Sequence, residues 1–261
     1  MWLESLAILG AGAWAGMINV IVGSGTLVTF PVLIMLGYAP ITANISSGIG
    51  LVAGSVTGAV GFRREISEQR TLALLLLPAG CAGGLAGGLL LLALPPEAFR
   101  KIVPALVGLG IVMVVVGPAL QRWLAKRRAG APSEGVESMS VGKRIGNLVA
   151  VFLLGVYGGY FGAALGVILL GALGILSTIA LPKLNAIKNL LVVGINGVSA
   201  TLFIVVATGY ISWRAVALLA IGSTLGGLLG ARIGRRIPSW LLRATVVVVG
   251  TIALVNLIVN S

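Results

Sequence analysis

Long apolar runs dominate this sequence and limit its fold more than any other feature. The hydrocarbon core of a bilayer is about 30 Å thick, so a helix needs about 20 consecutive apolar residues to cross it. Most runs approach that length, and no alternating pattern suggests a β-barrel. We therefore predict an all-α polytopic membrane protein with about eight to ten hydrophobic helical segments. The runs lie at residues 3–22, 26–37, 42–61, 71–94, 101–120, 145–161, 163–181, 184–207, 213–233 and 239–259.

The second run is too short to cross a bilayer as a straight helix. The turn before it, "VGSGT" at residues 22–26, would leave backbone groups unpaired in lipid. Such breaks persist at membrane depth only where protein buries them or a cavity solvates them. The first two runs are therefore predicted to form a broken or re-entrant hairpin. Glu4 and the absence of a basic residue before the first run argue against a cleaved signal peptide.

The distribution of basic residues predicts an orientation. If every run crosses, or the first hairpin returns to its own side, thirteen basic residues share one face and three lie on the other. The positive-inside rule makes the richer face cytoplasmic and places both termini outside. The three are Arg100, Lys101 and Arg214; the thirteen are Arg63, Arg64, Arg70, Arg122, Lys126, Arg127, Arg128, Lys143, Arg144, Lys183, Arg232, Arg235 and Arg236.

A hydrophilic connection at residues 121–144 separates two halves of similar pattern, residues 1–120 and 145–261. Its basic ends and its Ser, Gly, Pro and Glu centre favour a flexible cytoplasmic tether, with a regulatory site as the alternative. Each half has five runs, so the second begins on the opposite face and the copies are inverted, as in secondary transporters. The repeat rests on the pairs Pro40/Pro182, Gly80/Gly222, Gly84/Gly226, Gly88/Gly230, Pro96/Pro238, Gly16/Gly155 and Gly23/Gly162.

The charge pattern inside the runs favours an anion as the substrate. All six acidic residues are glutamates near termini or in connections, and the chain has no aspartate and no histidine. Metal sites and a Ser-His protease are therefore disfavoured, and so are cofactors. Lys188 lies well inside an apolar run, although a charge at bilayer depth costs about 2.5 to 3.5 kcal/mol. It shares a helical stripe with Asn185, Asn189, Asn196 and Ser199, a lining of neutral donors around one cation.

We expect the substrate to be bound between the halves. The break residues Gly23, Ser24, Gly25 and Thr26 offer backbone amides, with Ser46 and Ser47 from the same half; the second half contributes Lys188, Asn189 and Asn196. Two structural alternatives stay open. The stem of Lys188 could snorkel to the cytoplasmic interface, and Asn196 could hold two helices together.

The chain resembles the TauE/SafE family of sulfite and organosulfonate exporters over nearly its whole length. In the first half the resemblance rests on "GAWAGMINVIVGSGTLVTFPVLIMLGYAPITANISS", "GAVGFRREIS" and "LPPEAFRKI"; the second half repeats it more loosely in "GVYGGYFGAALGV", "LNAIKNLLVVGINGVSATLF" and "ATGYISW". The resemblance implies transport of a sulfur-containing or related carboxylate anion without choosing among them.

Together these features favour a secondary transporter of the cytoplasmic membrane, not an enzyme, that moves a small anion by alternating access. Export is the favoured direction and proton coupling is optional. No Walker A pattern is present, so ATP is not expected to bind. The implied partners are the anion and the lipid bilayer, with a homodimer left open and nucleic acid disfavoured despite the net charge of +12. The alternatives are a scaffold or assembly factor that docks partners through the basic loop and, less favoured, a Ser-Lys intramembrane enzyme.

Overall fold

The computed structural model describes residues 2–128, 140–177, 179–233 and 239–259, and its regular structure there is entirely helical. Eight of the helices are long and apolar enough to cross a membrane, whereas α2 and α8 have 10 and 12 residues. The predicted all-α polytopic fold is confirmed. The helices are α1 Trp2–Ile21, α2 Thr26–Met35, α3 Pro40–Gly61, α4 Arg63–Glu68, α5 Arg70–Ala93, α6 Pro96–Arg128, α7 Val141–Tyr160, α8 Leu165–Leu176, α9 Leu181–Val206, α10 Trp213–Ile233 and α11 Ser239–Val259, with a 3₁₀ turn, η2, at Thr208–Tyr210.

Two helical hairpins interrupt the bundle. The chain leaves α1 through Gly23, whose φ of +89° favours glycine, and returns in α2. It leaves α7 through Gly162 (φ +73°) and Ala164 (φ +55°) and returns in α8. The predicted break between the first two runs is thus present, and a second break follows α7. The run at 163–181 is not one helix, because Ser177 adopts extended backbone and ends α8.

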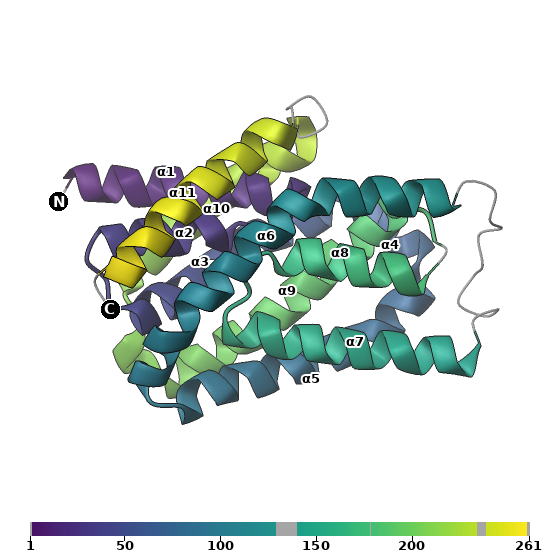
Figure 1. Ribbon diagram of the computed structural model, residues 1–261, viewed down its shortest axis with the longest axis horizontal. Helices are drawn as coiled ribbons and strands as arrows, with labels where there is room; N and C mark the ends of the chain where they lie inside the picture. Colours follow the sequence, from purple (N-terminus) through teal and green to yellow (C-terminus); the bar gives the residue numbers. More distant parts are fainter. Residues whose placement is uncertain (1, 129–139, 178, 234–238, 260–261) are drawn as a thin grey trace.

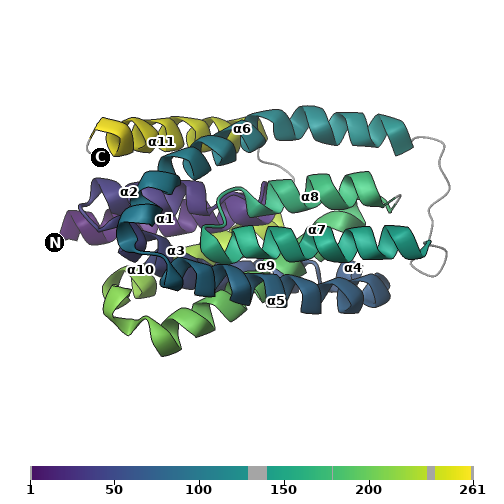
Figure 2. The ribbon, with the colours of Figure 1, turned by 60° about the horizontal axis from the view of Figure 1, so that its bottom comes forward.

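The bundle has two ends, and each carries its own ion pair. Figures 1 and 2 show both chain termini at one end, and the end of α6 with the start of α7 at the other. At the terminal end, Glu4 accepts a hydrogen bond from Tyr38 and pairs with Arg214, each at 3.1 Å. At the other end, Lys183 pairs with Glu68 at 3.2 Å. We call this second end the basic end.

The connection predicted at residues 121–144 is shorter in the structure. Helix α6 continues through Arg128, and α7 begins at Val141 after Ser140, whose hydroxyl accepts a hydrogen bond from the Lys143 amide. The flanks of the predicted linker are therefore helical. Its centre, with Glu134 and Glu137, lies outside the described residues, as do Arg235, Arg236 and Pro238.

Glycine ladders hold the two halves together. Helix α5 packs closely along α7, and α10 packs closely along α1. A Cβ added at Gly155 would lie 2.6 Å from the Gly80 carbonyl oxygen, and one at Gly230 would lie 3.1 Å from the Met17 Cα. The helix backbones are too close for larger residues, as the small-residue spacing predicts.

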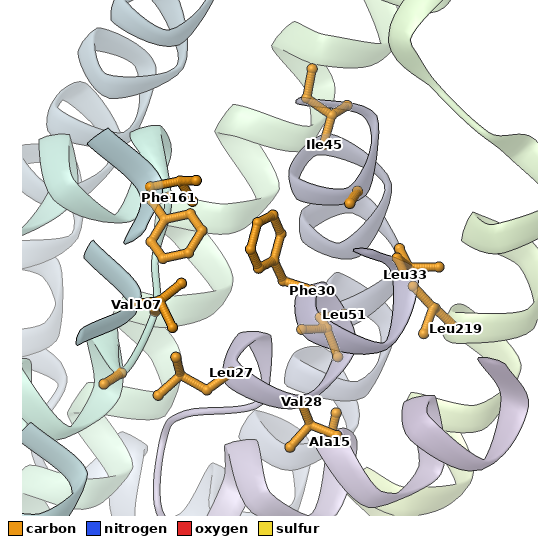
Figure 3. Close-up of a cluster of buried hydrophobic side chains, with 14 of the residues drawn as sticks. Ala15, Leu27, Val28, Phe30, Leu33, Ile45, Leu51, Val107, Phe161 and Leu219 are labelled. Atoms are coloured by element: carbon orange, nitrogen blue, oxygen red, sulfur yellow. The ribbon is translucent and has the colours of Figure 1, made fainter. Parts of the chain in front are cut away.

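Aromatic side chains pack the two hairpins against each other. Phe30 of α2 is fully buried and meets Phe161, which follows α7, edge to face with ring centroids 5.2 Å apart (Figure 3). Phe99 of α6 also packs on Phe161 and Tyr160. Such edge-to-face pairs add about 0.5–1.5 kcal/mol to the apolar burial. The two breaks are therefore held at fixed positions inside the bundle.

Candidate functional site

The two helical breaks meet inside the protein. The Gly166 amide donates a hydrogen bond of 3.0 Å to the Gly23 carbonyl. A Cβ built on either glycine would lie 2.6 Å from the Cα of the other. We call residues 23–26 and 162–166 together the hairpin crossing. Its backbones touch so closely that only glycine fits at both contact positions.

The hairpin crossing brings together the N-termini of two helices. Helix α2 begins at Thr26 and α8 begins at Leu165. The first amides of a helix have no acceptor within it, and the helix dipole makes this end positive. Most of these amides already have acceptors in the turns, because Leu27 and Val28 donate to the carbonyls of residues 24 and 25, and Leu165 and Gly166 donate to those of residues 162 and 23. The two ends therefore favour an anion mainly through their helix dipoles.

Helix α9 places Lys188 beside this crossing. A Cβ on Gly166 would lie 3.2 Å from the Lys188 Cδ, so the lysine stem packs on α8 next to the Gly23 contact. Lys188 is fully buried, and its Nζ has no hydrogen-bond partner within the described part of the chain. The snorkelling alternative is therefore wrong for this conformation, because the ammonium does not reach the surface.

Three further polar groups from the predicted set are buried without a partner among the described residues. They are the Ser24 hydroxyl, at the break, the Ser47 hydroxyl of α3, and the Asn189 amide nitrogen, next to Lys188 in the sequence. Buried polar groups without partners are uncommon in proteins, and each calls for an explanation. A polar ligand at the hairpin crossing would supply one.

A small cavity lies beside the crossing, on the side toward the later turns of α9. Thr26 and Asn196 line it, together with Asn44, Ser199 and Phe203. The Asn44 amide donates to the Tyr160 carbonyl at 3.0 Å, and the Ser199 hydroxyl lies 2.9 Å from the Gly84 carbonyl oxygen. The space open to the centre of a water-sized sphere is about 20 Å³, room for about one water.

The predicted site residues thus occupy two neighbouring places. Gly23 lies at the hairpin crossing with Lys188, and Ser24 and Gly25 follow in the same break, whereas Asn196 is eight residues along α9 from Lys188, about 12 Å along the helix axis. Ser46 has another contact, because its hydroxyl accepts a hydrogen bond from the Ser212 amide at 3.0 Å, before α10. Ser47 is fully buried, and its hydroxyl has no partner in the described ranges.

Sequence reasoning missed three residues of this region. Asn44 lies one helical turn before Ser47, a spacing that could have identified it. Gly166 gave no signal, because its role comes from a contact with the distant Gly23. Arg243 of α11 is a second cation within an apolar run; it is partly buried near Gly117 of α6.

A larger cavity lies between the hairpin crossing and the basic end. Its volume is about 490 Å³, within the usual range for ligand pockets. Ile21 and Asn185 line its inner part, two residues before Gly23 and one helical turn before Lys188. Glu65 of α4 also lines it. We call this cavity the vestibule.

Comparison with known proteins agrees with this architecture. Residues 8–257 match the family model described as "Sulfite exporter TauE/SafE". The chain is 26% identical over 252 residues to the "Probable membrane transporter protein YfcA" of Escherichia coli strain K12, covering 95% of this chain and 87% of the relative. It is 29% identical over 248 residues to a "Probable membrane transporter protein" of Haemophilus influenzae, covering 94% and 91%. No solved structure matches. With a family match across nearly its whole length and eight candidate membrane spans, the chain belongs to the TauE/SafE family of membrane transporters.

Proposed function

We propose that this protein is a secondary transporter of a small anion, either sulfite, an organosulfur or sulfonate anion, or a related carboxylate. The observation that carries the proposal is the buried amino group of Lys188, which has no hydrogen-bond partner among the described residues and lies beside the starts of two helices. Of the described glutamates, Glu4, Glu68 and Glu97 lie in first turns or in short α4, and Glu65 lines the vestibule; none of them is among the residues that contact Gly23, Gly166 or the small cavity. When Lys188 is protonated, the interior site is positive overall and complements an oxyanion.

The hairpins also support alternating access between inverted halves. The α1–α2 hairpin has a counterpart in α7–α8, and the close pair α1 with α10 has a counterpart in α7 with α5. An inverted repeat relates these elements if α1 corresponds to α7 and α5 to α10. The cavity beside the crossing holds about one water, so a larger anion enters only after the hairpins move apart. The vestibule offers the route from the basic end.

Flux measurements on proteoliposomes test this function directly. We expect uptake of sulfite, or of one member of a panel of sulfonates and small carboxylates, at least about tenfold above protein-free liposomes. An imposed pH gradient separates the coupling modes: acceleration indicates that a proton moves with the anion or on Lys188, and no effect indicates transport down the anion gradient. No flux for any member of the panel would contradict the proposal and favour the scaffold alternative.

The orientation is tested by labelling single cysteines. Cys81 is the only native cysteine, so Cys81→Ser provides a cysteine-free background. In intact cells an impermeant maleimide should label Tyr210→Cys, near the terminal end, several-fold faster than Arg64→Cys at the basic end. Permeabilisation should make the two rates similar. The reverse order in intact cells would place the basic end outside and contradict the positive-inside assignment.

A further inference from the structure

A lateral groove opens between α3 and α5, with α9 as its floor. Helices α3 and α5 both pack against α9, and the space left between them has a volume of about 580 Å³. The walls carry Val60, which is 52% exposed, and Leu74, which is 59% exposed; Leu190 and Val193 form the floor. In a membrane these apolar residues face hydrocarbon.

The end of this groove at α4 is cationic. Arg63, the first residue of α4, and Arg70, the first residue of α5, line the groove and form no ion pair with any described residue. The carboxylates of α4 have other neighbours, because Glu68 pairs with Lys183 at 3.2 Å and Glu65 lines the vestibule. The groove therefore has two guanidinium groups and no carboxylate at its polar end.

These two features together specify the chemistry of the occupant. Guanidinium groups bind phosphate oxygens through paired hydrogen bonds, while the groove beyond them accepts only apolar groups. A soluble anion does not need the apolar part, and a second copy of this chain would have to bring its own acidic residues to the arginines. An anionic phospholipid has both parts, and the arginines lie at the membrane end where basic side chains meet lipid headgroups.

We propose that the groove binds one anionic phospholipid, with an acyl chain between α3 and α5 and its phosphate between Arg63 and Arg70. The lipid would contact α9 through Leu190 and Val193, so it would brace the back of the helix that carries Lys188. This binding does not depend on the identity of the transported anion.

Native mass spectrometry of the detergent-purified protein tests the proposal with phosphatidylglycerol and phosphatidylethanolamine of identical acyl chains. We expect one phosphatidylglycerol per chain, retained at least about fivefold better than phosphatidylethanolamine. The double variant Arg63→Gln, Arg70→Gln should lose this preference. The matched control Arg64→Gln removes a charge from α4 outside the groove. This variant should keep most of the preference for phosphatidylglycerol. Equal retention of the two lipids, or an Arg64→Gln effect as large as that of the double variant, would overturn the proposal.

A second variant tests the apolar part while both arginines remain. Val60→Trp fills the groove and should lower phosphatidylglycerol retention several-fold. Val60 is half exposed, so the larger side chain fits without disturbing the core. Unchanged retention in this variant would place the lipid elsewhere. Displacement of the lipid by inorganic phosphate alone would reduce the site to a phosphate site, and a dimer that Val60→Trp dissociates would assign the groove to a second copy of the chain.

Discussion

Lys188→Met is expected to abolish transport and at the same time stabilise the protein. Among the described residues, Lys188 is the cationic side chain that packs directly on the hairpin crossing. A hydrogen bond to a charged group contributes about 1.5–3 kcal/mol, which corresponds to a loss of roughly 10- to 150-fold in anion binding. Flux of the transported anion should fall by at least that factor.

The gain in stability follows from the same burial. Desolvating an unpaired charge costs several kcal/mol, and replacing buried charges by apolar side chains of similar volume is often stabilising by about 1–4 kcal/mol. Methionine keeps the length of the lysine stem that packs on Gly166. Each kcal/mol raises the midpoint by about 2–4 °C in a chain of 150–250 residues. Thermal unfolding in detergent, followed by tryptophan fluorescence, should therefore show a higher midpoint for Lys188→Met.

Lys183→Met is the matched control. It lies on the same helix but is partly exposed and paired with Glu68, and exposed ion pairs contribute about 0–1 kcal/mol. Its flux and unfolding midpoint should both stay near those of the native chain. If Lys188→Met were instead less stable and fully active, the lysine would be a structural residue and the anion site would lie elsewhere.

Much of the fold could be predicted because a bilayer imposes helix lengths. Eight of the predicted runs correspond to helices that are long and apolar enough to cross a membrane, and the glycine and serine residues at 23–25 identified the first break. The early end of α8 could not be predicted, because residues 163–181 are continuously apolar and only the backbone at Ser177 ends the helix. The inverted relation between the halves remains a proposal.

The site was predictable only where composition isolates a residue. Lys188 is conspicuous because charges are costly within an apolar run, whereas Arg243 lies near the start of its run and was not singled out. Ser46 was assigned to the substrate, yet its hydroxyl accepts from the Ser212 amide. A contact between residues 166 positions apart leaves no sign in a local pattern. Gly166 was missed for the same reason.

Gly166→Ala is expected to destabilise the protein and inactivate it. Gly166 lies within α8, where alanine would normally be preferred by about 1 kcal/mol. Here the added Cβ would lie 2.6 Å from the Gly23 Cα and 3.2 Å from the Lys188 Cδ. Overpacking of this kind costs about 1–3 kcal/mol, so the unfolding midpoint should fall by several degrees. The unfolding midpoint of Gly23→Ala should fall further, because alanine at a φ of +89° adds about 1–2 kcal/mol of backbone strain.

Gly197→Ala supplies the comparison that isolates the contact. It lies in α9, the helix of Lys188, and a Cβ there would meet no atom within 4 Å. The unfolding midpoint of Gly197→Ala should stay unchanged or rise slightly, and its flux should equal that of the native chain. If Gly166→Ala behaves in the same way, the two hairpins do not meet as described. If its flux per folded molecule is native despite lower stability, the crossing holds the hairpins together without contacting the anion. If Gly166→Ala keeps the wild-type fold but loses flux per folded molecule, then the new methyl group either blocks the path of the anion or prevents the hairpins from moving apart.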